Sequence, residues 1–556
     1  MAPGPASVLA TSLSAAARRW ALDLTRRRSV TGSPDEGSFG PWLAARLRAD
    51  PAFADAKVWT FPVSPGDARH VVAMLVRGTG PRTLVLTGHY DTVALSDYGD
   101  LADLATEPDL LAEALRGRLA AAAGTPAARR AAADLASGDF LPGRGLLDMK
   151  AGLAAGLAVA AAFAGAGREG NLLVLAVPDE EANSAGARAA APALRGLAAE
   201  HGLELVGAVN LDAIADDGDG SDGRAITLGT VGKVLPTAFV AGLATHAGFP
   251  LAGLNAAVLA GAIARRVEWA AELADPGWSR ATPPSLLSLR DGKPAYDVTT
   301  PGRAFATFNV LFVSLTPEEI LARFAALCRE ATAQVLAELR GRAAGFAAVG
   351  RAIDAVPDIP VLRFAELAAR ARVAAPGAEE EALAASGGPD VSLPERSRRV
   401  TEALWQASGL AGPAVVVGFG SVPYLPTRLS DRPDARRLAE ACALAAREAP
   451  GPAVRCVDVF AGISDMSFLG EADEASLAPV AANTPIWPLL EWPQTGGIAG
   501  LPMVNAGPWG RDYHTPLERM HVGYGFDVLP LMVDRIARRM VSDRGARPPA
   551  GQAGKA

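Results

Sequence analysis

Acidic residues and histidines recur in this sequence directly after short apolar runs or inside glycine-bounded turns. Five such places carry residues that could do chemistry: His89 with Asp91, Asp148, Glu180 with Glu181, Asp212, and His514. No cysteine lies near any of them in the sequence. Imidazole and carboxylate ligands without thiolates suit a catalytic Zn²⁺, Co²⁺ or Mn²⁺ site better than a structural zinc site. A carboxylate bridging two ions about 3.5–4 Å apart would build a two-metal hydrolytic centre.

Each motif alone also has a simpler interpretation. A His-x-Asp pair fits a turn histidine capped by its aspartate, and the acids that begin at Asp179 are typical of a solvated loop. The glycine-rich segment 143–152, G-R-G-L-L-D-M-K-A-G, could cradle a phosphate, although it lacks the Walker spacing and an acidic partner for a ribose. The five places together favour the metal site.

The elements that must position these residues alternate between strands and helices. Residues 83–87, 171–177 and 205–211 are short, apolar and partly β-branched, and the segments between them are mostly Ala-rich and helical. This alternation predicts an α/β fold with a largely parallel, buried sheet. Ligands of such sheets bind beyond the carboxyl ends of the strands, which is where the acids and histidines stand.

Two further segments interrupt this catalytic α/β pattern. Residues 97–139 contain two Ala-rich helical stretches around Gly124-Thr125-Pro126, so we expect a lid or an edge elaboration there. After the acidic, glycine-rich stretch 216–223, four strands and two helices predict an inserted α+β domain. The strands are predicted at 225–230, up to Thr245, 285–289 and 304–313, and the helices at 255–273 and 317–339.

These boundaries predict four parts. The parts are a first catalytic segment (1–222), the inserted domain (223–395), a second catalytic segment (396–541) and a disordered tail (542–556).

Composition excludes several classes of function. The chain has 556 residues, of which 50% are hydrophobic and 20% charged, with a formal net charge of -7. Basic residues are scattered, so no nucleic-acid partner is expected. The sequence contains no uncharged, strongly apolar run of about 18 residues, so no membrane span is expected. The three cysteines lie far apart without metal or disulfide spacing, which indicates a reducing, cytoplasmic location.

The motifs together resemble a known family of dinuclear-zinc metallohydrolases, which includes aminoacylases, succinyl-diaminopimelate desuccinylase and glutamate carboxypeptidase. The motifs H-x-D, G-R-G-x-x-D-M-K, D-E-E and G-P-x-G…H-T-P-x-E stand here in the family's order. The long spacer between His89 and Asp148, the segment G-I-S-D-M-S-F at 462–468 and the segment 487–492 are similar to the branch of the arginine-utilisation protein RocB.

The resemblance implies a role for each site residue. His89 and Asp212 would hold one metal ion, Glu181 and His514 the other, and Asp148 would bridge them. Asp91 would orient His89, and Glu180 would be the general base for water attack on an amide carbonyl. The implied cofactors are two divalent ions, Zn²⁺ first and Co²⁺ or Mn²⁺ as alternatives. The implied substrate is a small amino-acid-derived amide or a short peptide.

The resemblance also implies that the inserted domain is a ferredoxin-like lid or dimerisation domain, and this domain carries one more implied residue. His246, in T-H-A-G-F-P, resembles a lid histidine that stabilises the oxyanion in relatives, often across a dimer interface. The resemblance therefore also implies a homodimer through this domain as one option. The alternative interpretation of His246 is a structural histidine at a strand-to-helix turn. Many relatives grip a substrate carboxylate with an arginine on the late lid strand, but this strand offers only Asn309. A catalytically silent metal-dependent binding or regulatory protein and a nucleotide-dependent enzyme are the alternative functions.

The remaining candidates are expected to support the structure. Lys150 and Glu518 would support the site rather than react. His70, His201 and His521 are expected to be surface or structural residues.

Overall fold

The computed structural model describes residues 5–121, 124–165, 167–347, 358–388, 390–490, 492 and 499–542. Apart from Ser542, the predicted tail at 542–556 lies outside these residues. The chain divides into two compact units, and each is described by itself. The first unit comprises Met1–Thr230, Thr427–Ala472 and Thr495–Ala556, and the second comprises Val231–Pro426 and Asp473–Gln494.

The first unit is built on an eight-stranded sheet in the order β1-β2-β5-β3-β6-β18-β8-β17. Its strands are β1 (Lys57–Pro62), β2 (His70–Arg77), β3 (Thr79–His89), β5 (Glu169–Val177), β6 (Glu204–Asn210), β8 (Ala225–Thr227), β17 (Arg455–Val457) and β18 (Met503–Asn505). The central strands β5, β3, β6 and β18 run parallel, while β1 and β2 are antiparallel additions. The predicted α/β class with a largely parallel catalytic sheet is confirmed.

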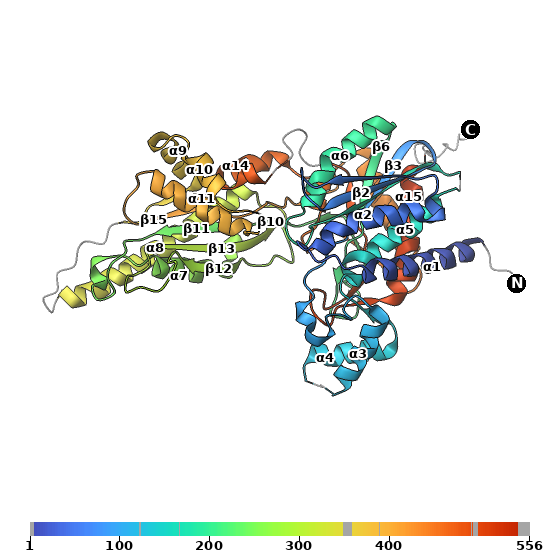
Figure 1. Cartoon of the computed structure of the whole chain (residues 1–556), viewed down its shortest axis with the longest axis horizontal. Helices are drawn as coiled ribbons and strands as arrows, with labels where there is room; N and C mark the ends of the chain where they lie inside the picture. The colour runs from blue at the N-terminus through green and yellow to red at the C-terminus, as the bar shows by residue number, and fades with distance from the viewer. Residues whose placement is uncertain are drawn as a thin grey trace, which may run out of the picture. The chain divides into compact units, whose positions relative to one another are not determined.

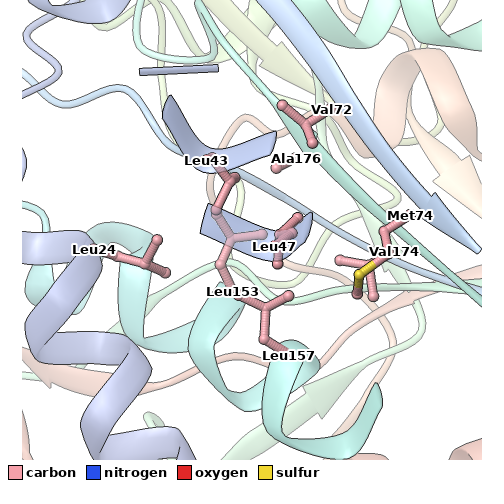
Figure 2. A pocket seen from close by; sticks show the side chains of 9 residues that line it. All are labelled: Leu24, Leu43, Leu47, Val72, Met74, Leu153, Leu157, Val174 and Ala176. Atoms are coloured by element: carbon pink, nitrogen blue, oxygen red, sulfur yellow. The ribbon is translucent and has the colours of Figure 1, made fainter. Parts of the chain in front are cut away.

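Helices cover both faces of this sheet, and several are labelled in Figure 1. They are α1 (Pro5–Arg26), α2 (Pro34–Ala49), α5 (Ala151–Phe163), α6 (Ala185–His201), α12 (Pro433–Arg447), α13 (Met466–Leu469) and α15 (Leu529–Val541). Alternate residues of β2, such as Val72 and Met74, join the core beneath α1, α2, α5 and α15. Figure 2 shows a small cavity in this core, lined by nine apolar side chains, so it is a packing gap and not a polar binding site.

Helix α5 lies in the centre of this core. The stretch Leu146–Phe163 is long and apolar enough to cross a membrane, but 89% of it is buried inside the protein. A Cβ atom at Gly152 would meet the Leu211 carbonyl oxygen at 1.9 Å, so the helix approaches the end of β6 closely. The small residues of α5 therefore serve packing against the sheet.

The segment 97–139 forms a small subdomain of the first unit. It contains a 3₁₀ helix, η2 (Ser96–Leu101), and the helices α3 (Pro108–Ala121) and α4 (Pro126–Ser137), which pack side by side. The predicted pair of helices is confirmed. A four-stranded sheet adjoins it in the order β4-β20-β19-β7, with β4 (Phe140–Pro142), β7 (Ile214–Ala215), β19 (Trp509–Arg511) and β20 (Arg519–His521).

The second unit contains a six-stranded sheet in the order β10-β13-β11-β15-β14, with β12 paired to β13. The strands are β10 (Gly232–Val234), β11 (Pro236–Ala241), β12 (Ser285–Asp291), β13 (Arg303–Phe312), β14 (Val361–Arg363) and β15 (Ala414–Phe419). Helices α7 (Ala256–Val267) and α8 (Pro317–Ala347) share one core with the sheet. Further helices are α9 (Phe364–Ala374), α10 (Ala378–Ala385), α11 (Leu393–Ala407) and α14 (Leu477–Asn483).

The units differ from the predicted boundaries at both ends of the insertion. Strand β8 belongs to the first sheet, so the second unit begins at Val231 and not at residue 223. Residues 396–426, assigned to the catalytic domain from the sequence, belong to the second unit because β15 pairs with β11. All six residues of β15 are buried. Its sequence therefore resembles that of a buried strand of the catalytic sheet, which explains the wrong assignment.

Candidate metal centre

Three of the predicted site motifs meet because their strands are neighbours. Strands β5, β3 and β6 lie side by side and parallel, so their carboxyl ends share one edge. His89 is the last residue of β3, Glu180 and Glu181 follow β5, and Asp212 follows β6. The side chains of His89 and Asp212 are almost fully buried, at 1% and 8% exposure.

Two loops bring the remaining ligands to the same edge. Asp148 stands in the irregular turn η3 (Leu146–Lys150) that leads into α5, and His514 stands in the hairpin loop between β19 and β20. Four of the five described non-glycine residues with positive φ are in site loops: Asp179, Ser184, Asp512 and His514. Such backbone conformations are uncommon for these residue types and need tertiary support.

Asp148 lies between the two histidines. Its Oδ1 is 3.1 Å from His89 Nε2, and its Oδ2 is 3.2 Å from His514 Nε2. Around this carboxylate, Glu181 Oε1 lies 3.1 Å from His514 Nε2, and Asp212 Oδ1 lies 3.7 Å from His89 Nε2. His89, Asp148 and Glu181 offer ligand atoms that lie within 4.8 Å of one another, as a metal ion requires.

Asp91 connects the histidine strand to the acidic loop. Its carboxylate accepts hydrogen bonds from the backbone N–H of Glu180 (3.1 Å) and of Glu181 (3.2 Å), and from the Thr31 hydroxyl (2.8 Å). The Asp91 carbonyl oxygen lies 3.1 Å from His89 Nδ1, while Nε2 of the same ring faces the acids. Asp91 therefore contacts both the imidazole and the loop that follows β5, as a ligand-orienting residue would.

The pKa values of the cluster indicate a lack of positive charge. Burial raises the pKa of Glu180, Glu181 and Asp212, and neighbouring acids raise these pKa values further. Burial alone lowers the pKa of His514, but hydrogen bonds to Asp148 and Glu181 outweigh it and raise this pKa to about 10. The cluster thus favours bound protons or cations.

Glycines let the ligand loops approach closely. A Cβ at Gly507 would meet the Asp212 carbonyl oxygen at 1.9 Å, and Gly145 has φ 75° with Thr92 Cγ2 at 2.4 Å from its Cβ position. The backbone N–H of Gly145 donates to Glu518 Oε1 at 3.0 Å, and that of Gly143 donates to the Glu518 carbonyl oxygen. These N–H groups are occupied, which argues against the phosphate-cradling interpretation of this loop.

Lys150 and Glu518 are fully buried and hydrogen-bonded within the first unit, and their supporting role stays a prediction. The Lys150 ammonium donates to the Arg27 carbonyl oxygen at 2.8 Å and lies over the Phe39 ring. Burial lowers the pKa of this amine to about 7. Glu518 accepts from Arg144 at 2.7 Å, and both side chains are 1% exposed.

The run of acids suggested that Asp179 lies in a solvated loop, but the structure buries this residue. It is 4% exposed, pairs with Arg69, and accepts from the backbone N–H of Ala185 at 3.1 Å. Arg69 lies 110 residues away in sequence, so the sequence offered no sign of this partner.

Asp465 is a buried acid that interacts electrostatically with the cluster, and the sequence analysis did not single it out. It lies at the start of α13, is 1% exposed, and both of its carboxylate oxygens are shielded from solvent. Burial raises its pKa to about 7, and Asp91 and Asp212 add to this rise, while His89 and Ser184 oppose it. The signal was an acid among small and apolar residues in G-I-S-D-M-S-F, a segment to which no chemistry had been assigned.

The other four histidines make contacts of their own. His246 belongs to the second unit, where it is exposed and its Nδ1 accepts from the Gly248 backbone N–H at 3.0 Å. His201 packs on Trp59, and His521 stacks on Trp509 with ring centroids 4.9 Å apart. His70 lies at the start of β2 with Nδ1 near the Ala68 carbonyl oxygen.

Comparison with known proteins shows the family of the chain. Residues 126–479 match the family described as Peptidase family M20/M25/M40. The chain is 31% identical to the uncharacterized protein YqjN of Bacillus subtilis over 91% of this chain and 93% of that protein. It is 26% identical to Protein RocB of the same organism, over 91% of this chain and 92% of RocB.

A solved structure shares the fold. An M20 family metallo-carboxypeptidase from Sulfolobus solfataricus matches with a TM-score of 0.50 and 11% identity, over 95% of this chain and 99% of that chain. The chain belongs to the M20/M25/M40 peptidase family and shares its fold. The predicted resemblance to metallohydrolases with RocB as a relative is confirmed, and the chain is a hydrolase of this family.

Proposed function

We propose that this chain hydrolyses an amide or peptide bond in a small amino-acid-derived substrate, using two divalent metal ions. The position of Asp148 carries the proposal, because its two oxygens lie 3.1 and 3.2 Å from the Nε2 atoms of two different histidines. A carboxylate in this position is suited to bridge two ions. Membership of a peptidase family supports the reaction class.

The donor set fits divalent ions. His89 and Asp212 would hold one ion and Glu181 and His514 the other, with Asp148 shared. All these donors are nitrogen or oxygen atoms, and the raised pKa values of the buried acids indicate a site that gains from added positive charge. Ions bound there would lower the pKa of a water and polarise the substrate carbonyl. We expect Zn²⁺, with Co²⁺ or Mn²⁺ as substitutes.

Glu180 is the proposed general base. Its Oε2 lies 3.9 Å from His89 Nε2, and its backbone N–H is held by Asp91. Burial raises the pKa of Glu180, so this carboxylate can accept a proton from the attacking water and return it to the leaving nitrogen.

The test combines metal analysis with a substrate screen. The purified chain is stripped with a chelator, reloaded with Zn²⁺, Co²⁺ or Mn²⁺, and incubated with N-acyl amino acids and dipeptides, whose cleavage is followed by mass spectrometry. We expect cleavage that chelation abolishes and metal restores. Glu180→Gln should bind metal but lose turnover, whereas Glu200→Gln, at an exposed carboxylate, should behave as the parent. Ligand stabilisation without turnover would instead support a silent binding protein.

His246 is the proposed oxyanion-stabilising residue of the second unit. It is exposed at the turn after β11, which leaves its imidazole open to a substrate or a second copy of the chain. Loss of one such donor typically lowers kcat about 10²–10³-fold. His246→Ala should therefore lower kcat by that factor and leave the bound metal unchanged, and an unchanged kcat would remove this assignment.

We also propose that two copies pair through the second unit. Strand β12 pairs with β13 alone among the described strands, so its other edge is open. Leu287 and Leu289 on this strand are 57% and 42% exposed, and the nearby Trp269 is 75% exposed. Exposed apolar edge strands favour association. Light scattering should give twice the chain mass, and Leu287→Asp should give the monomer mass; a monomeric parent would contradict the pairing.

The three cysteines are free thiols, Cys328 and Cys442 buried and Cys456 exposed. This fits the reducing, cytoplasmic location that we infer.

A further inference from the structure

The loop that carries His514 is closed by two arginines. Strands β19 and β20 are antiparallel, and their last paired residues are Arg511 and Arg519. Like charges directly opposite each other destabilise an antiparallel pair. Arg519 is moreover only 1% exposed, so water cannot screen its charge. The hairpin therefore needs a buried counter-charge at this position.

Asp134 on helix α4 supplies that counter-charge. Its two oxygens lie 2.6 and 2.7 Å from Arg511 Nη1, and Oδ2 also accepts from Arg519 Nε at 2.8 Å and Nη2 at 2.6 Å. The Asp134 side chain is 12% exposed. One carboxylate from the segment 97–139 thus joins the two strands that flank the ligand loop.

The network continues into the loop itself. Arg519 Nη1 donates to Asp512 Oδ2 at 2.7 Å and to the Leu517 carbonyl oxygen at 2.8 Å. Arg130, also on α4, lies 3.3 Å from Asp512 Oδ1. Asp512 and His514 both have left-handed backbones, with φ 54° and 61°. Such strained positions persist when their surroundings hold them.

Apolar packing attaches the same segment to the loop. The segment 97–139 has its own small core, which includes Tyr98, Leu111 and Leu135, and Leu517 of the ligand loop packs against it. Strand β4 pairs with β20, so the backbone that leads to Asp148 is also hydrogen-bonded to this hairpin.

We propose that the segment 97–139 is a clamp that fixes the loop of the metal ligand His514, and that Asp134 is its positioning residue. This inference rests on the proposed function, since it assumes that His514 holds an ion. Asp134 itself touches neither ion nor substrate. It acts by neutralising Arg511 and Arg519, which keeps the hairpin closed and His514 near Glu181 and Asp148.

The test measures metal affinity directly in the full-length chain. Zn²⁺ stoichiometry is measured by elemental analysis, and the affinity for each ion by competition with a chromophoric chelator. Asp134→Asn should keep one ion and bind the second about 10–100-fold more weakly, as losses of ligand-orienting groups do. His514→Ala identifies the ion in question. Asp100→Asn is the matched control, because Asp100 forms an exposed pair with Arg118 in the same segment; it should retain both affinities.

A rescue separates positioning from general damage to the fold. In Asp134→Asn with Arg511→Met, the uncompensated guanidinium facing Arg519 is removed, so affinity for the second ion should recover in part. Asp134→Glu, which keeps the charge, should fall between parent and Asp134→Asn, and it serves if the amide variant does not fold. Parent-like affinity in Asp134→Asn, equal loss of both ions, or equal loss in Asp100→Asn would overturn the clamp. A parent chain that binds no divalent ion would overturn the proposed function and the clamp with it.

Discussion

Asp91→Asn tests the connection between the histidine strand and the acidic loop. The Asp91 carboxylate is fully buried and accepts three hydrogen bonds, from the backbone N–H of Glu180, the backbone N–H of Glu181 and the Thr31 hydroxyl. An asparagine has the same shape but only one accepting oxygen. One backbone N–H of the loop would therefore face an NH₂ group and stay unpaired.

The magnitude follows from these contacts. A hydrogen bond to a charged group contributes about 1.5–3 kcal/mol, and a buried donor left unpaired costs about 1–3 kcal/mol. We expect Asp91→Asn to lower the unfolding free energy of the metal-free chain by about 2–3 kcal/mol, on the basis of one lost charged hydrogen bond. Metal affinity should fall about 10–100-fold, because the variant no longer fixes the backbone of Glu180 and Glu181, although the Asp91 carbonyl oxygen that faces His89 is kept.

Urea denaturation in the presence of a chelator measures the unfolding free energy, and competition with a chromophoric chelator measures the metal affinity. Thr31→Val is the control, since it removes only the hydroxyl donor and should cost about 1 kcal/mol. Asp91→Asn also removes one negative charge from a cluster of buried acids, which reduces repulsion and should raise the stability of the metal-free chain. An Asp91→Asn chain that is more stable than the parent, with unchanged metal affinity, would show that repulsion outweighs the hydrogen bonds and would refute the reasoning.

Three further predictions concern residues of the first unit that would gain or lose protons: Glu180, His514 and Asp465. Glu180→Gln should lower kcat about 10²–10⁴-fold without changing metal content, as measured by steady-state kinetics and elemental analysis. The pKa of His514 is raised to about 10, so the stability it contributes is present below about pH 6.5 and is lost as pH rises toward 10. In chelator, the denaturation midpoint should fall between pH 6 and pH 10 in the parent and less steeply in His514→Ala. The pKa of Asp465 is raised to about 7, so the stability that its protonated form contributes is lost as pH rises from about 4 to 7. Asp465→Asn should therefore flatten this part of the plot of denaturation midpoint against pH.

Much of the candidate site could be predicted because its residues stand at the ends of strands that the sequence marks clearly. The runs at 83–87, 171–177 and 205–211 match β3, β5 and β6, and their parallel order brings His89, Glu181 and Asp212 to one edge. Buried parallel strands are apolar throughout, so both the strand and its polar end are visible in a single sequence. The roles of these residues as ligands stay predictions.

The sequence was less informative where two sheets compete for the same kind of strand. Strand β15, A-V-V-V-G-F, is a short apolar strand that is fully buried, as the second half of β3 is, so its sequence does not tell which sheet it joins. Asp465 was missed for a related reason. A single acid in a short segment gives no periodic pattern, and its burial beside Ser184 depends on how α13 packs on α6.

The arginines of the His514 loop show how tertiary contacts give meaning to residues that look ordinary in the sequence. Arg511 and Arg519 are eight positions apart, and that spacing gives no sign that they face each other. Only the register of β19 and β20 places them opposite, and α4, more than 370 residues earlier, supplies through Asp134 the carboxylate that binds both of them. A segment that looked like an edge elaboration thus reaches the hairpin of a proposed metal ligand. Changes within 97–139 that keep Asp134, Arg130 and the packing against Leu517 in place should therefore leave metal binding intact, while changes that move Asp134 should not.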